Sequence, residues 1–316
     1  MRSHAAGTWT GAEGSTWLAR ARVYLALTKP RIIELLLVTT VPAMVLADRG
    51  LPDPWLVVAV LVGGTLAAGG ANTINCVIDR DIDEKMGRTK RRPLPMGSVS
   101  PTAALRFGLA LEAIAFVFLW RTVNLLAALL SVGATAFYVF IYTMWLKRTT
   151  AQNIVIGGAA GAVPVLVGWA AVTGRVGLPA WVMFAIVFMW TPPHFWALAM
   201  RYREDYARAG VPMLPVVAGP DATRLQILIY SLILAPLAMA PAVIGLGGTL
   251  YAAIASVLGA LFVVMAVDCY SKREGEAADL AAKNLFAYSV LYLFLLFAAL
   301  LVEQGFGISL PPLWAS

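Results

Sequence analysis

The stretch PWLVVAVLVGGTLAAGGANTI, residues 54–74, contains no charged side chain and is long enough to cross a lipid bilayer. A membrane-spanning helix needs roughly 20 predominantly apolar residues. The rest of the chain has the same character, because 60% of its 316 residues are apolar and 13% are charged. Soluble domains carry about 25% charged residues. The sequence therefore predicts an all-α protein embedded in the bilayer.

Further apolar stretches extend on both sides of this one, and we expect a polytopic bundle of nine transmembrane helices. They are expected at residues 32–47, 54–74, 103–120, 125–145, 154–173, 179–200, 225–246, 250–267 and 285–302. Small residues recur in several of them, for example Gly63-Gly64 and Gly157-Gly158, which indicates close helix–helix approach. We expect residues 1–22 to form a disordered cytoplasmic tail and residues 23–316 to form one membrane domain.

The distribution of basic residues predicts the orientation. Of the 24 Lys and Arg residues, all but Arg49, Arg121 and Arg175 lie in the tail and in alternate loops. By the positive-inside rule, the N-terminus is cytoplasmic and, after nine spans, the C-terminus is outside. The net charge of +7 thus reflects topology and predicts no nucleic-acid partner. A bacterial plasma (inner) membrane is the expected location, with the mitochondrial inner membrane as the alternative.

Three oxygen-bearing side chains follow the second span at intervals of four residues: Asn75, Asp79 and Asp83. On a helix this spacing forms one stripe, rising about 6 Å per step. Aligned carboxylates with an amide oxygen suit Mg²⁺, which commonly bridges to substrate phosphates. The alternative interpretation is a solvated, charge-paired helix end. Carboxylates at the mouth of a membrane bundle are costly and usually functional, so we favour the metal site.

Several motifs together carry a family resemblance. The run from Asn75 to Leu94 resembles the first aspartate motif of the UbiA superfamily of intramembrane prenyltransferases. Four other segments are similar to the haem-modifying branch of that superfamily. They are LTKPR (27–31), YTMWLKRT (142–149), PPHFWAL (192–198) and DYARAGVPMLP (205–215).

The resemblance implies a nine-helix UbiA-like fold and a specific reaction. The expected activity is transfer of the farnesyl group of farnesyl diphosphate to a vinyl group of protohaem IX (haem b). Water is added in the same reaction, which yields haem O and diphosphate, with Mg²⁺ as cofactor. The resemblance also raises a haem A synthase or an oxidase assembly factor as a protein partner.

The resemblance also implies roles for individual residues. Asn75, Asp79 and Asp83 are expected to be catalytic and to bind the metal. Asp205 is expected as a further ligand in a reduced second motif, because Ala209 stands where many members carry a second Asp. The residues expected to contact the diphosphate are Arg88, Arg92, Lys147, Arg148 and Arg203.

On the acceptor side, His194, Tyr142 and Trp196 are the candidates for contact with the haem or the prenyl group. His194 is expected to be catalytic, as iron ligand or as proton acceptor. Pro192-Pro193 before it is expected to break or kink the helix. If the helix continued to Asp205, the two side chains would share a face about 16 Å apart.

Competing functions remain open from the residues alone. One is a prenyltransferase acting on an aromatic acid or quinone precursor. Others are a transporter, since intramembrane charges also mark ion paths, and a haem-binding membrane scaffold. Charges clustered at one face argue against a transporter, and a scaffold has no need of the Asn75, Asp79 and Asp83 stripe.

Overall fold

The computed structural model describes residues 17–305, with all their side chains except those of residues 31–37. Every regular element in that range is helical, which confirms the predicted all-α class. The long helices are α2 (Pro30–Asp48), α3 (Pro54–Ile78), α5 (Pro101–Thr122), α6 (Leu125–Ala136), α8 (Asn153–Thr173), α9 (Leu178–Arg201), α12 (Gly219–Leu237), α14 (Thr249–Ser271) and α15 (Gly275–Gly305). The helix α6 continues into a π-helical segment, η1 (Phe137–Leu146), and then into α7 (Lys147–Thr149).

Eight helical stretches in the described range are long and apolar enough to cross a membrane. They match the predicted spans from the second onward, although α15 begins ten residues earlier than expected, at Gly275 rather than residue 285. The first predicted span, residues 32–47, lies within α2, but the side chains of residues 31–37 in this helix lie outside the described part of the structure. The count of nine therefore stays a prediction. Of the tail expected over residues 1–22, residues 17–22 belong to the helix α1 (Trp17–Thr28), and residues 1–16 lie outside the described range.

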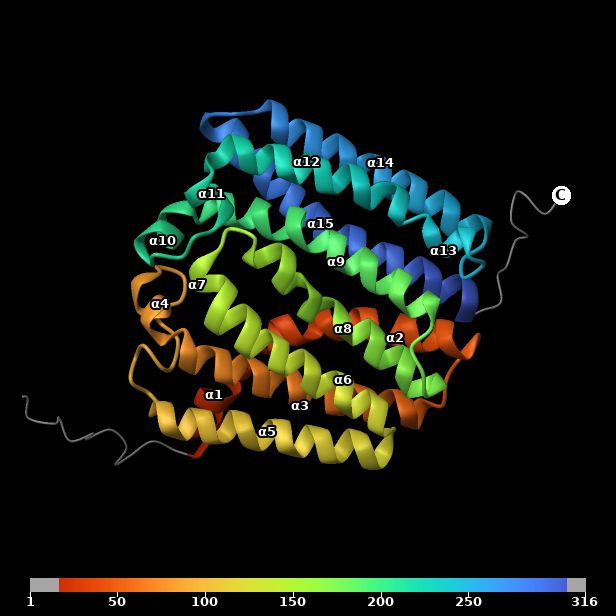
Figure 1. Cartoon of the computed structure of the whole chain (residues 1–316), viewed down its shortest axis with the longest axis horizontal. Helices are drawn as coiled ribbons and strands as arrows, with labels where there is room; N and C mark the ends of the chain where they lie inside the picture. Colours follow the sequence, from red (N-terminus) through yellow and green to blue (C-terminus); the bar gives the residue numbers. More distant parts are fainter. Residues whose placement is uncertain (1–16, 306–316) are drawn as a thin grey trace, which may run out of the picture.

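The short helices gather mainly at one end of the bundle. In Figure 1, α4 (Arg80–Lys85), α7, α10 (Arg203–Arg208) and α11 (Leu214–Val217) lie at the left end, whereas α13 (Ala240–Val243) lies at the right. The left end is the one to which the positive-inside rule assigns the cytoplasm. The two acidic segments, on α4 and α10, thus lie at the same end of the bundle.

Local sequence explains where several helices begin. Asp53 precedes Pro54 and accepts a hydrogen bond from the backbone N–H of Trp55 at 2.8 Å. Ser100 precedes Pro101 and accepts from the N–H of Ala103 at 3.2 Å. A capping side chain followed by proline favours the start of a helix. The first backbone N–H groups of a helix have no acceptor within the helix, and proline has no N–H that would stay unpaired.

Glycines allow close contacts between helices, as their distribution predicts. A Cβ on Gly70 of α3 would lie 2.9 Å from the backbone oxygen of Gly108 on α5. A Cβ on Gly168 of α8 would lie 2.6 Å from the backbone oxygen of Thr40 on α2. Both are too close for a side chain, so these backbones can approach only because the residues are glycine.

The prolines of α9 do not break the helix. The helix runs without interruption from Leu178 to Arg201, with Pro192 and Pro193 inside it, so of the expected break or kink the break does not occur. Membrane helices tolerate internal proline where neighbouring helices and hydroxyl side chains compensate. Here α8, α12 and α15 all pack against α9, and Thr191 donates its hydroxyl to the carbonyl of Val187 at 2.9 Å. The helix ends at Arg201, so His194 and Asp205 do not share one helix.

Candidate active site

Asn75, Asp79 and Asp83 lie along one face where α3 passes into α4. The backbone N–H of Asp79 donates to Asn75 and that of Asp83 to Asp79, at 2.9 and 2.8 Å, so the four-residue periodicity continues across the junction. The side chains are buried, with 3%, 1% and 3% of their surfaces exposed. Asn75 Nδ2 also donates to Asp79 Oδ2 at 2.8 Å. The stripe predicted from spacing is therefore present.

A second stripe faces the first and is formed by Thr143 and Lys147, which lie four residues apart on the segment η1–α7. Thr143 lies opposite Asn75, and Lys147 lies opposite Asp79. Asn75 Nδ2 donates to Thr143 Oγ1 at 3.1 Å, and Lys147 Nζ lies 2.5 Å from Asp79 Oδ2. Thr143 lies in η1 and its hydroxyl donates to the carbonyl of Tyr138, five residues earlier. Short π-helical segments are frequent at functional sites. Here the segment brings a hydroxyl and a cation onto the acidic stripe.

Arginines neutralise the remaining carboxylates. Arg92 makes two hydrogen bonds to Asp83, at 3.0 and 2.8 Å. Arg148 makes two to Asp81, both at 2.8 Å, and its Nη2 lies 3.7 Å from Asp79 Oδ1. The hydrogen bonds from Arg148 lower the pKa of Asp81 to about 2. Three of the five predicted diphosphate contacts, Arg92, Lys147 and Arg148, thus surround the acidic stripe.

Lys29 belongs to this cluster and was not among the predicted site residues. Its Nζ donates to Asn75 Oδ1 at 2.7 Å. The residue adopts a left-handed conformation, φ 54°, between α1 and α2, which is uncommon for a residue other than glycine. Asn72 holds this turn by donating to the carbonyl of Thr28 at 3.0 Å. Burial lowers the pKa of Lys29. The available signal was a lysine directly before Pro30, which the charge count attributed to topology alone.

Asp79 Oδ1 is the atom that best fits a metal ion. It is buried and accepts no hydrogen bond within the described residues, since Arg148 Nη2, at 3.7 Å, is beyond hydrogen-bond distance. A carboxylate oxygen left in this state is costly unless a cation binds it. No three His, Cys, Asp or Glu side chains in the described range gather as a metal cluster. A metal here would therefore be bound by the two carboxylates and the Asn75 amide oxygen, with further oxygens from a substrate.

The second acidic segment lies against the first. Asp205 on α10 lies so close to Gly87 that a Cβ there would be 3.3 Å from Asp205 Oδ2. Asp205 also pairs with Arg208 at 3.2 Å. Arg88 lies over the ring of Tyr202, 5.4 Å from its centroid. Arg203 is exposed on α10 and makes no ion pair with the acidic stripe in the described range.

The three predicted acceptor-side residues do not form one group. Tyr142 stacks on Tyr138 at 5.5 Å in η1, the segment whose Thr143 contacts Asn75. Trp196 is buried and packs edge-on against Tyr230 of α12, at 5.4 Å. His194 lies instead against α15, where its Nδ1 is 2.7 Å from Ser289 Oγ. Tyr142 is thus the one of the three that belongs to the segment in contact with the acidic stripe.

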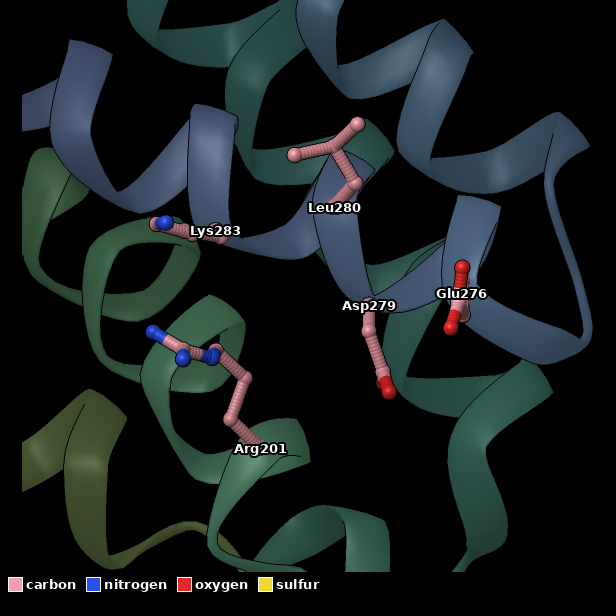
Figure 2. Close-up of a pocket in the computed structure, with 5 residues that line it drawn as sticks. All are labelled: Arg201, Glu276, Asp279, Leu280 and Lys283. Carbon is pink, nitrogen blue, oxygen red and sulfur yellow. The ribbon is translucent and has the colours of Figure 1, made fainter.

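A charged cavity of about 440 Å³ lies where α9 ends beside the start of α15. Figure 2 shows the basic groups of Arg201 and Lys283 on one side and the carboxylates of Glu276 and Asp279 on the other. Sequence reasoning singled out none of these residues as a site. They belong to the same two helices as His194 and Ser289, nearer the end to which the charge pattern assigns the cytoplasm.

The family model of the UbiA prenyltransferase family matches residues 36–296. The chain belongs to the UbiA prenyltransferase family. It is therefore an enzyme of the prenyltransferase class and an integral, multi-pass membrane protein, which sets aside the transporter and scaffold interpretations.

Curated relatives indicate which members of the UbiA family this chain is similar to. A "Protoheme IX farnesyltransferase" of Parafrankia sp. (strain EAN1pec) is 55% identical over 281 residues, covering 89% of this chain and 90% of the relative. One from Mycobacterium avium (strain 104) is 55% identical over 288 residues, covering 90% and 92%.

Solved structures share the UbiA fold at low sequence identity. The structure described as digeranylgeranylglyceryl phosphate synthase superposes with a TM-score of 0.74 at 18% identity, covering 90% of this chain and 98% of that one. A UbiA homologue from Archaeoglobus fulgidus, bound to DMAPP and Mg²⁺, superposes with a TM-score of 0.66 at 19% identity, covering 88% and 99%. At these identities the likeness establishes the fold alone.

Proposed function

We propose that this chain transfers the farnesyl group of farnesyl diphosphate to a vinyl group of protohaem IX. Water adds to the same vinyl group, so the products are haem O and diphosphate. The names of relatives that are 55% identical over about nine-tenths of the chain support this assignment. The acidic stripe paired with cations at one end of an apolar bundle supports the diphosphate half of the reaction.

The observation that carries the proposal is that every carboxylate of the stripe already faces a cation. Asp79 faces Lys147 and Asp83 faces Arg92, while Lys29 binds the Asn75 amide. A metal–diphosphate complex can bind both the acidic and the basic side chains of this cluster. The carboxylates bind the metal, and the Lys and Arg side chains bind the phosphate oxygens. A simple structural ion pair would not need the additional buried Lys29 beside a neutral amide.

Asn75, Asp79 and Asp83 would hold Mg²⁺, and Asp205 would assist from α10. The metal, when bound, supplies charge neutralisation that makes diphosphate a leaving group. Lys147, Arg148, Arg92 and Lys29 bind the phosphate oxygens and hold them at the stripe. Arg88 and Arg203 lie nearer the second acidic segment and add positive charge at the entrance.

The residues around the stripe also serve the organic part of the substrate. Tyr142 and Tyr138 stack on each other in η1, the segment that contacts the acidic stripe through Thr143, and an aromatic face attracts a cation. An allylic cation left by diphosphate departure would be stabilised there and kept from bulk water by the apolar helices. His194 acts on the haem side, and Trp196 closes the apolar wall on the α12 side.

The membrane orientation is part of the proposal. The short helices α4, α7, α10 and α11 and both acidic segments lie at the end of the bundle where Lys and Arg concentrate, and we assign that end to the cytoplasm of a bacterial plasma membrane. Farnesyl diphosphate then reaches the site from the cytoplasm with its chain in the bilayer. Docking to a haem A synthase or an oxidase assembly factor stays a prediction.

The test uses the purified full-length protein with haem b, farnesyl diphosphate and Mg²⁺, and measures the product by mass spectrometry. The expected product has the mass of haem b plus one farnesyl group and one hydroxyl group. Prenylation of 4-hydroxybenzoate or a quinone precursor, with no haem product, would favour the alternative acceptor. Haem binding with no diphosphate release would contradict the proposal as a whole.

A further inference from the structure

The buried Ser289 of α15 makes two short hydrogen bonds that together determine the protonation of His194. Ser289 Oγ lies 2.6 Å from the carbonyl oxygen of Phe286 and 2.7 Å from His194 Nδ1. Two oxygens at 2.6 Å repel each other unless a proton lies between them, so the hydroxyl donates to Phe286. A hydroxyl has one proton to donate. The bond to His194 must therefore have Nδ1–H as its donor.

The imidazole ring is held in this orientation from both faces. Trp190 stacks on one face with a centroid distance of 4.2 Å, and Phe286 stacks at 4.7 Å. Phe195 adds an edge-to-face contact at 5.2 Å. Trp190 in turn donates its indole N–H to the backbone carbonyl of Ser289 at 2.7 Å. The ring is thus fixed relative to Ser289.

This arrangement leaves the lone pair of His194 Nε2 unused. No hydrogen bond reaches Nε2 from any residue of the described range. In metal sites, the group that binds the other ring nitrogen of a histidine determines which nitrogen is presented to the ligand.

We propose that Ser289 is a positioning residue that holds His194 as the Nδ1–H tautomer and so presents Nε2 as a lone-pair donor to the haem substrate. This inference rests on the proposed function for the identity of the acceptor. It assigns no contact of Ser289 itself with the substrate.

The lone pair has a defined place in the reaction. Breaking the C–O bond of farnesyl diphosphate sends the electron pair to diphosphate, and the vinyl π electrons form the new C–C bond. The oxygen of water then bonds to the electron-deficient vinyl carbon and releases one proton, which Nε2 can accept. The same lone pair can instead ligate the haem iron, and the two uses differ spectroscopically.

The tautomer can be measured without any substrate. The chain contains two histidines, so a His4→Ala variant labelled with ¹⁵N-histidine reports His194 alone. We expect a protonated Nδ1 and an unprotonated Nε2 in this variant, and a change in tautomer when Ser289→Ala is added. A protonated Nε2 in the starting protein, or the same tautomer after Ser289→Ala, would overturn the inference whatever the reaction proves to be.

Turnover then tests whether the tautomer matters. Ser289→Ala should lower kcat or haem affinity about 10- to 100-fold, the usual effect of losing such a supporting hydrogen bond, and leave KM for farnesyl diphosphate unchanged. Ser289→Thr, which keeps the hydroxyl, should restore most of the activity. Ser231→Ala is the matched control, because Ser231 is equally buried and its hydroxyl donates to a carbonyl within its own helix.

The absorption spectrum of bound ferric haem separates the two uses of Nε2. A spectral change in Ser289→Ala indicates iron ligation, whereas reduced kcat with an unchanged spectrum indicates proton transfer. Equal kcat, haem affinity and spectrum in Ser289→Ala, Ser289→Thr and the parent would refute the positioning role. A parent protein that makes no haem product would refute the proposed function instead. The tautomer measurement needs no substrate, so it would still test whether Ser289 determines the tautomer of His194.

Discussion

Asp79 and Lys147 are 68 residues apart in the chain, yet Lys147 Nζ lies 2.5 Å from Asp79 Oδ2. Asn75 and Thr143 are also 68 residues apart and are joined by a hydrogen bond of 3.1 Å. Two contacts with the same offset, one helical turn apart, mean that α3 and the η1–α7 segment run parallel and in register. The candidate site is therefore built from two facing helical stripes.

This pairing predicts separate effects on stability and on activity. Lys147→Met leaves Asp79 buried without its closest cation, which should destabilise the protein by about 3–5 kcal/mol. The double variant Asp79→Asn with Lys147→Met should regain most of that stability and remain inactive. Thermal unfolding in detergent and product formation measure the two quantities. A double variant as unstable as Lys147→Met would contradict the pairing.

The acidic stripe itself should be essential for turnover. Asp79→Ala or Asp83→Ala should abolish haem O formation, because each removes a proposed metal ligand. Chelation of Mg²⁺ should abolish it as well, and added Mg²⁺ should restore it in the parent alone. Retained activity in either alanine variant would refute the metal site.

Arg92 should act on diphosphate binding. Arg92→Met should raise KM for farnesyl diphosphate about tenfold or more, because a hydrogen bond to a charged group contributes roughly 1.5–3 kcal/mol. Arg80→Met is the matched control, since Arg80 is exposed on α4 and pairs with Glu84 at 3.5 Å. Steady-state kinetics with varied farnesyl diphosphate provide the comparison. Equal KM values in the two variants would remove Arg92 from the site.

Lys29 should behave as a member of the same site. Lys29→Met should lower kcat/KM for farnesyl diphosphate about tenfold, and Lys29→Arg should keep part of it, because a cation remains near Asn75. KM for haem should be unchanged in both variants. If Lys29→Met instead altered KM for haem alone, the residue would belong to the acceptor side.

Helix packing yields a prediction about stability within one helix. Gly168→Ala places a Cβ 2.6 Å from the backbone oxygen of Thr40, so α8 and α2 must separate. Such overpacking costs typically 1–3 kcal/mol. Gly161→Ala in the same helix meets no atom within 4 Å and should leave the unfolding temperature unchanged or raise it. Equal unfolding temperatures would show that α2 and α8 do not pack as closely as this.

His194 should be needed for the acceptor. His194→Gly should lose haem O formation, and added imidazole should restore part of it by supplying the missing nitrogen. His194→Ala with full haem affinity and full turnover would reduce the residue to a packing role.

The sequence by itself determined the helical class, most of the membrane spans and the stripe of Asn75, Asp79 and Asp83. These depend on local hydrophobicity and on a four-residue period, which any helix converts into a common face. It also placed the two acidic segments at one end, because four predicted spans, an even number, lie between them and return the chain to the same side of the bilayer.

Tertiary structure alone decided which cations meet which carboxylates. Lys29 reaches Asn75 through a left-handed turn that Asn72 holds, and no local pattern predicts that turn. The uninterrupted α9 likewise depends on neighbouring helices that compensate Pro192 and Pro193. Ser289 meets His194 across 95 residues of chain because α9 and α15 pack together, so its effect on the imidazole tautomer could be seen only in the folded bundle.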